Sequence, residues 1–169
     1  MTTTLILGGA RSGKSARAQA LVEAKGAGWL YIATAEALDA EMAERIAYHR
    51  ADRGPIWRTI EAPLDLVSVL EEGTRQEDRV LVDCLTLWLS NLMHHERDVE
   101  AEGDRLCVCL QTFKSEIVLV SNEVGLGLVP DTSLGRRFRD AQGRLNQKVA
   151  TVCDVVEFVA AGLPLRLKG

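Results

Sequence analysis

The chain has no excess of positive charge and no long apolar segment. Its 169 residues give a formal net charge of −4 and a sequence pI of about 5.4. A protein that binds nucleic acid needs a basic surface to displace counterions, so this balance argues against such a partner. No stretch approaches the roughly 20 apolar residues of a membrane span, and the first residues lack the pattern of a signal peptide. We therefore expect a cytoplasmic protein without a membrane span.

Cysteine and histidine are scarce and show no ligand spacing. The four cysteines are Cys84, Cys107, Cys109 and Cys153, and the chain holds three histidines. This pattern indicates neither a zinc site nor a disulfide framework, and it fits reduced thiols. A chain of this length with 47% hydrophobic residues can bury one core. The sequence thus predicts a single domain over residues 1–169.

Short β-branched or apolar segments alternate with amphipathic ones along the chain. The predicted strands are residues 3–7, 29–33, 56–60, 79–82, 117–120 and 155–160, with a final hairpin strand at 165–168. The predicted helices are residues 14–25, 39–52, 63–72, 86–94 and 133–152. We interpret the acidic segment 96–104 as a surface loop. The alternation predicts an α/β fold with a mainly parallel sheet flanked by helices.

The first predicted strand and helix enclose a glycine-rich segment that matches the pattern G-x-x-x-x-G-K-[ST]. It consists of Gly8, Gly9, Ala10, Arg11, Ser12, Gly13, Lys14 and Ser15. Glycine lets the backbone turn its N–H groups toward phosphate oxygens, and the following helix adds its positive N-terminal end. Lys14 would contact the β- and γ-phosphates, and Ser15 would ligate Mg²⁺. The sequence therefore predicts a P-loop that binds GTP or ATP.

Polar residues follow the other predicted strands, where an open parallel sheet binds its ligand. They are Thr34, Ala35 and Glu36 after the second strand, Glu61 after the third, Asp83 after the fourth, and Ser121, Asn122 and Glu123 after the fifth. Asp83 occupies the place of a Walker B acid, which would hold Mg²⁺ or a water. Asp83 and Glu123 are both candidates for the base that deprotonates a substrate hydroxyl.

The predicted helix 39–52 carries a histidine beside arginines. At 100° per residue, Met42, Ile46, His49 and Arg53 fall within about 60° of one another. Neighbouring positive charge favours the neutral imidazole, which is a competent nucleophile toward phosphorus. The same spacing also fits a structural or solvated histidine, so the residues alone leave both roles open.

Besides the P-loop, the sequence contains several further blocks: Tyr31-Ile32-Ala33-Thr34, Arg45-Ile46-x-x-His49-x-x-x-Arg53, Trp57-x-Thr59-x-Glu61, Val82-Asp83-Cys84-Leu85-Thr86, Val120-Ser121-Asn122-Glu123-Val124-Gly125-x-Gly127-x-Val129-Pro130 and Phe138-Arg139-Asp140-x-x-Gly143-Arg144-x-Asn146-Gln147. Together these blocks resemble the bifunctional adenosylcobinamide kinase/adenosylcobinamide-phosphate guanylyltransferase family of cobalamin biosynthesis. The resemblance covers the chain except the region 98–114. It implies a single-domain RecA-like P-loop NTPase fold and a homotrimer.

The resemblance implies two reactions on one scaffold. ATP or GTP phosphorylates the aminopropanol hydroxyl of adenosylcobinamide, and GMP is then transferred from GTP to that phosphate with release of pyrophosphate. His49 would carry GMP as a covalent phosphoramidate, with Lys14 and Asp83 also catalytic and with Mg²⁺ on Ser15 and Asp83. Besides the P-loop, the implied nucleotide contacts are Thr34, Ala35, Glu36, Arg50, Ala51, Asp52, Arg53, Glu61 and Asp83.

Other interpretations remain open at this point. A monofunctional P-loop kinase would use His49 structurally, and covalent capture of GMP separates it from the bifunctional enzyme. A GTP-binding regulatory protein would bind without turnover, and NTP consumption that depends on cobinamide excludes it. A DNA motor is disfavoured by the acidic balance and the lack of a basic strip. The sequence leaves the preferred NTP and the corrinoid-binding residues undetermined.

Overall fold

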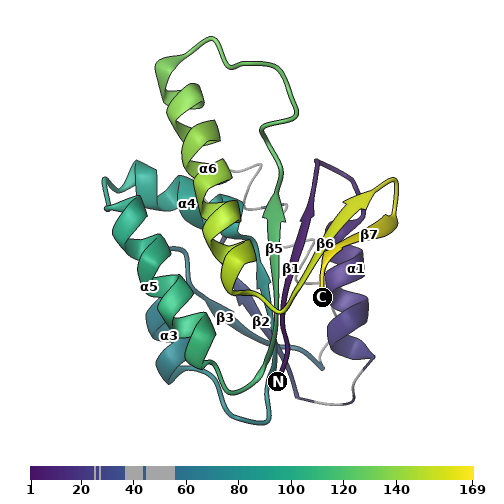
Figure 1. Cartoon of the computed structure of the whole chain (residues 1–169). Coiled ribbons are helices and arrows are strands. Elements are labelled where there is room, and N and C mark those ends of the chain that lie inside the picture. Colours follow the sequence, from purple (N-terminus) through teal and green to yellow (C-terminus); the bar gives the residue numbers. More distant parts are fainter. Residues whose placement is uncertain (25, 27, 37–43, 45–55) are drawn as a thin grey trace.

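The computed structural model describes residues 1–24, 26, 28–36, 44 and 56–169, and its centre is a sheet with helices on both faces (Figure 1). The strands are β1 (Thr3–Gly8), β2 (Trp29–Ala33), β3 (Arg58–Glu61), β4 (Arg79–Asp83), β5 (Glu116–Asn122), β6 (Val155–Ala160) and β7 (Leu163–Lys168). The helices are α1 (Lys14–Glu23), α3 (Leu66–Glu72), α4 (Leu85–His94), α5 (Val99–Thr112) and α6 (Ser133–Val152).

The strand order brings the ends of the central strands together at one edge of the sheet. The order is β3-β2-β4-β5-β1-β6-β7, and among the described strands only β6 and β7 pair in antiparallel orientation. In the register, Gly8 lies beside Asn122, and Asp83 lies beside Val120. The carboxyl ends of β1, β4 and β5 are therefore neighbours. The predicted α/β fold with a mainly parallel sheet is confirmed.

The two faces of the sheet bury separate sets of apolar side chains, because successive strand residues point to opposite faces. In β1, Leu5 and Leu7 belong to the larger core with α3, α4, α5 and α6. Ile6 belongs to the smaller core, which α1 covers with Ala18 and Val22. Of the described helices, α1 thus lies on one face of the sheet, and α3, α4, α5 and α6 lie on the other.

A buried ion pair fixes α1 to the sheet. Arg17 of α1 donates to Glu157 of β6 through two nitrogens, at 2.9 and 3.0 Å, and Arg166 of β7 approaches the same carboxylate at 3.4 Å. These donors lower the pKa of Glu157, chiefly through the hydrogen bonds from Arg17. Because α1 begins at the P-loop, this contact also sets the position of the loop.

Helix α5 corrects the sequence-based interpretation of residues 96–104 as a surface loop. Asp98 caps the helix, since its Oδ1 accepts hydrogen bonds from the N–H groups of Glu100 and Ala101. Acidic residues in a first turn favour the helix through its dipole. Glu102 is buried by pairing with Arg97 and Arg105. Residues 96–98 therefore lie between two helices as predicted, whereas residues 99–104 are the start of α5 rather than a loop.

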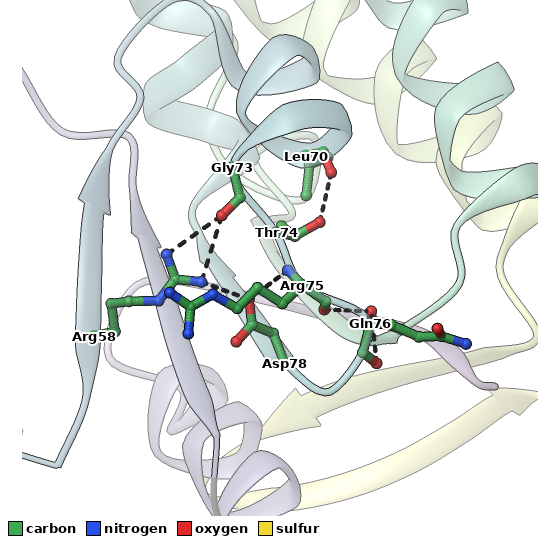
Figure 2. A network of polar contacts seen from close by, with 8 residues as sticks. Arg58, Leu70, Gly73, Thr74, Arg75, Gln76 and Asp78 are labelled. Carbon is green, nitrogen blue, oxygen red and sulfur yellow. Dashed lines mark hydrogen bonds and ion pairs between the residues drawn. The ribbon is translucent and has the colours of Figure 1, made fainter.

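The amino edge of the sheet, opposite the P-loop, is closed by a polar network (Figure 2). Asp78 accepts from the Arg58 guanidinium and, at 2.7 Å, from the N–H of Arg75. The Arg58 guanidinium also donates to the carbonyl of Gly73, and the Thr74 hydroxyl donates to the carbonyl of Leu70 at 2.7 Å. The network joins β3 to the turn between α3 and β4.

Several predicted boundaries shift by a few residues. Strand β3 begins at Arg58 rather than at residue 56, α3 begins at Leu66 rather than at residue 63, and β7 begins at Leu163 rather than at residue 165. The predicted helix 39–52 lies outside the described residues. Within the described part of the chain, no helix has the length and apolar character to cross a bilayer.

Candidate active site at the P-loop

The P-loop is packed so tightly that two of its glycines have no room for a side chain. A Cβ on Gly8 would lie 2.5 Å from Ser12 Oγ and 2.6 Å from the carbonyl oxygen of Val159. Gly13 has φ of 95°, in the left-handed region that favours glycine, and a Cβ there would lie 3.0 Å from Gly162 Cα. The N–H of Gly162 donates to the Ser12 carbonyl at 2.8 Å, so the β6–β7 turn supports the loop.

The loop presents positive groups where phosphates would bind. Lys14 Nζ donates to the Gly9 carbonyl at 3.1 Å, which folds its ammonium group across the loop. Ser12 Oγ is buried and has no hydrogen-bond partner among the described residues. A buried hydroxyl without a partner is rare and costs free energy unless a ligand completes it. With the N-terminal end of α1 adjacent, these residues fit the phosphates of a nucleotide.

Asp83 stands at the end of β4 and has a fixed orientation. Its Oδ2 accepts a hydrogen bond of 3.2 Å from the hydroxyl of Tyr31 in β2. The next residue, Cys84, is buried, and burial together with the charge of Asp83 raises the pKa of its thiol to about 11. Cys84 therefore stays protonated near neutral pH, and Asp83 is the ionisable group at this strand end.

The predicted nucleotide contact Thr34 has a structural role in its side chain. Thr34 is fully buried, its hydroxyl donates to the Cys84 carbonyl at 2.7 Å, and it accepts from the Cys84 N–H at 2.8 Å. Its own carbonyl accepts from Asn91 Nδ2 at 2.7 Å. Thr34 thus ties the end of β2 to the residue that follows Asp83, and its hydroxyl is already occupied.

The remaining predicted contacts are spread along the edge. Ala35 and Glu36 follow Thr34, and the carboxylate of Glu36 lies 3.1 Å from Nε2 of His95. Glu61 ends β3 at the edge of the sheet, four strand spacings from β1, or roughly 19 Å at about 4.8 Å each. The structure therefore groups the P-loop and Asp83 at the centre and leaves Glu61 at the periphery.

The predicted nucleophile lies outside the described residues, as do its neighbours. These are His49, Arg50, Ala51, Asp52 and Arg53. Among the described residues, no cluster of three or more histidine, cysteine, aspartate or glutamate side chains forms a metal site. Ser15 and Asp83 as ligands of Mg²⁺ therefore remain a prediction. One hydroxyl and one carboxylate are nevertheless the oxygen ligands that Mg²⁺ takes beside substrate phosphates.

A buried polar network behind the strand ends was not predicted. Ser121 of β5 donates to Asn146 Oδ1 at 2.7 Å, and Gln142 Nε2 donates to Ser121 Oγ and to Asn146 Oδ1, each at 2.9 Å. Gln142 and Asn146 lie four residues apart on α6, so both interrupt its apolar stripe on one side. That interruption was the signal in the sequence, because amides on a buried helix face need polar partners.

The fold and the P-loop together define the class of protein. The chain has a P-loop NTPase fold with a nucleotide site. Solved structures agree on the fold. The RadB recombinase aligns with a TM-score of 0.55 at 14% identity, covering 93% of this chain and 73% of that one. An ATPase of the type III secretion system aligns with a TM-score of 0.52 at 12% identity, covering 98% of this chain and 56% of that one. At these identities the likeness shows the RecA-like fold alone.

The particular family follows from the sequence. Residues 4–167 match the family model described as cobinamide kinase / cobinamide phosphate guanyltransferase, and the chain belongs to that family. The bifunctional adenosylcobalamin biosynthesis protein CobP of Pseudomonas aeruginosa is 50% identical over 167 residues, covering 98% of this chain and 96% of the relative. CobU of Escherichia coli K12, with the same bifunctional description, is 37% identical and covers 97% and 98% respectively. The predicted resemblance is confirmed, and the chain is a bifunctional enzyme of cobalamin biosynthesis.

Proposed function

We propose that the chain phosphorylates adenosylcobinamide with ATP or GTP and then transfers GMP from GTP to the new phosphate through His49. One observation carries the nucleotide part of this proposal. The loop before α1 holds the Lys14 ammonium over a cradle in which the buried Ser12 hydroxyl has no partner among the described residues. A phosphate chain would complete both groups.

In the first reaction the hydroxyl oxygen of the aminopropanol group attacks the γ-phosphorus. The bond from that phosphorus to the β–γ bridging oxygen breaks, and the hydroxyl proton passes to a carboxylate. The P-loop amides and Lys14 would balance the charge that builds up on the phosphate oxygens. Bound Mg²⁺ would add positive charge there, held by Ser15 and Asp83.

In the second reaction two displacements replace one. An imidazole nitrogen of His49 attacks the α-phosphorus of GTP and pyrophosphate leaves, giving a phosphoramidate. A phosphate oxygen of the cobinamide phosphate then attacks the same phosphorus and His49 leaves. Arg50 and Arg53 would neutralise the phosphates, and Thr34, Ala35, Glu36, Ala51, Asp52, Glu61 and Asp83 would contribute further contacts to the nucleotide.

Intact mass measurement after incubation with GTP and Mg²⁺ tests this proposal. We expect an adduct with the mass of GMP whose bond is stable in base and labile in acid, as a phosphoramidate requires. The His49→Ala variant should lose the adduct, while His94→Ala, a change at a histidine without an assigned role, should keep it. A labelled His49→Ala protein would point to another nucleophile, and an unlabelled wild type would favour a monofunctional kinase.

We also propose a cytoplasmic homotrimer, as the family resemblance implies. Support comes from apolar side chains that β7 leaves exposed, since Leu163, Leu165 and Leu167 are 73%, 62% and 57% exposed. An exposed apolar strip of this kind commonly marks a contact between subunits. The mass of the particle in solution, measured by light scattering, checks this assignment.

A further inference from the structure

The backbone at the carboxyl end of β5 is held by hydrogen bonds to α4, to α6 and to the first residue of the P-loop. The N–H of Asn122 donates to Thr86 Oγ1 at 2.7 Å, and the carbonyl of Asn122 accepts from Asn146 Nδ2 at 3.0 Å. The N–H of the next residue, Glu123, donates to the carbonyl of Gly8 at 3.0 Å. Three hydrogen bonds therefore fix the backbone that carries the Glu123 side chain beside the first residue of the P-loop.

The partners in these contacts are themselves fixed from behind. Thr86, Ser121, Gln142 and Asn146 are all buried, and Ser121 and Gln142 are fully so. Gln142 and Asn146 bridge α6 to Ser121, while the Thr86 hydroxyl of α4 lies 3.5 Å from Ser121 Oγ. A buried network of this kind gives its members one arrangement, because each group left unpaired costs free energy. The network therefore determines where Asn122 and Glu123 lie.

The Glu123 side chain lines the end of a cavity of about 440 Å³. The cavity lies between α6 and the strands β1, β6 and β7, and its other lining residues include Leu7, Gly143, Gln147 and Leu167. Its Oε1 accepts a hydrogen bond from the Gly125 N–H at 2.7 Å, which holds the partly exposed carboxylate in place. Asp83, the other candidate base, is engaged by the Tyr31 hydroxyl and is the predicted ligand of Mg²⁺.

We propose that Glu123 is the general base of the kinase reaction and that the buried network positions it. The acceptor hydroxyl would enter from the cavity beside α6 and lose its proton to the Glu123 carboxylate as its oxygen bonds to the γ-phosphorus. Thr86, Gln142 and Asn146 are then positioning residues, which act through Asn122. This assignment rests on the proposed function.

The two reactions of the enzyme provide the test, because only one of them needs a base. The phosphate oxygen that attacks in the second reaction is already ionised near pH 7. We therefore expect Glu123→Gln to lower the kcat for phosphorylation of adenosylcobinamide by about 100-fold or more. Transfer of GMP to separately supplied cobinamide phosphate should stay at the wild-type rate. Glu72→Gln, an exposed change in α3, serves as the matched control and should leave both rates unchanged.

The positioning role has its own variants. Thr86→Val keeps the shape of the side chain but removes the acceptor of the Asn122 N–H, and we expect kcat of the kinase reaction to fall roughly 10-fold. Thr86→Ser restores the hydroxyl and should restore most of the rate. Thr74→Val removes a hydroxyl at the opposite edge of the sheet and should leave the kinase reaction unchanged, although it also removes a hydrogen bond.

The outcomes separate this inference from the proposed function. Glu123→Gln protein that phosphorylates at the wild-type rate, or that loses both reactions equally, overturns the assignment of the base. If Thr86→Val lowers the melting temperature without changing the kinase rate, the network is structural only. If the wild-type protein itself fails to phosphorylate adenosylcobinamide, the proposed function is wrong, and the variants then say nothing separate about the base.

Discussion

The two edges of the sheet differ in how completely their polar groups are paired. At the amino edge, Asp78 accepts from Arg58 and Arg75, and Ser115 Oγ donates to the carbonyl of Arg75 at 3.0 Å (Figure 2). At the carboxyl edge, Ser12 Oγ, Asn122 Oδ1 and Gln142 Oε1 are buried and without partners among the described residues. A fourth such atom, Trp29 Nε1, belongs to the start of β2.

The unpaired groups at the carboxyl edge are where a bound ligand can add stabilising hydrogen bonds. A polar group that hydrogen-bonds to a protein partner stabilises the fold. A buried polar group left unpaired costs free energy, which a hydrogen bond from a bound ligand can recover. Three of these four unpaired atoms lie near the P-loop and β5, and one, Trp29 Nε1, lies at the amino edge, where the Asp78 carboxylate is paired. We therefore expect changes at the carboxyl edge to act on binding and catalysis, and changes at the amino edge to act on stability.

The largest effect should come from Lys14→Ala. Removing the ammonium group takes away a charge-assisted contact to the phosphates, so GTP binding should weaken by roughly 100-fold or more, about 3 kcal/mol. The melting temperature should change little, because Lys14 Nζ contributes one hydrogen bond to the loop. Calorimetric titration with GTP measures the affinity, with Lys114→Ala at the amino edge as the control. Wild-type affinity in Lys14→Ala would reject the P-loop assignment.

The second largest effect should come from Asp78→Ala, which we expect to lower the stability of the fold and to leave GTP binding unchanged. Asp78 is 6% exposed, and its loss leaves the Arg75 N–H without its acceptor and removes one of the two acceptors of the Arg58 guanidinium. We expect the free energy of unfolding to fall by about 2 kcal/mol, discounted because Arg58 is partly exposed. Denaturant titration checks this loss, and exposed Asp140→Ala should show none. If the folded variant bound GTP more weakly than wild type, the amino edge would also act on binding, which contradicts the expected difference between the two edges.

The smallest effect should come from Glu157, whose contribution to the stability of the fold should depend on pH. Its pKa is lowered by Arg17, so the stabilisation is present above the ordinary pKa of a glutamate and is lost as the pH falls through the folded-state value. Glu157→Gln should therefore be less stable than wild type by about 1–2 kcal/mol at pH 7. The difference should shrink in acid below about pH 4. Thermal unfolding across pH 3–7 measures it, and a difference independent of pH would contradict the role of the charge.

Local sequence patterns predicted the centre of this molecule well. The P-loop depends on consecutive residues and on the strand and helix that flank it, so its position followed from the motif. The strands β1, β4 and β5 are short runs of apolar residues, and the polar residues that end β4 and follow β5 in the sequence located Asp83 and Glu123. Membership of the family followed from the spacing of several such blocks.

Features that depend on contacts between distant segments could not be predicted in the same way. The acidic start of α5 has the composition of a loop, and its helix is stabilised by the Asp98 cap and by the pairing of Glu102 with arginines. The hydroxyl of Thr34 looked available for a nucleotide, yet a residue 50 positions away engages it. The network from Ser121 to Gln142 likewise joins two elements whose proximity only the fold reveals.

The contact between Gly162 and Ser12 has a consequence for how the enzyme comes into being. The P-loop, residues 8–15, is synthesised well before the β6–β7 turn that packs against it through Gly162. The strands on either side of β1, which are β5 and β6, are also synthesised late. A growing chain therefore completes the surroundings of its P-loop only after β5, β6 and the β6–β7 turn have been synthesised and have packed against β1 and the loop.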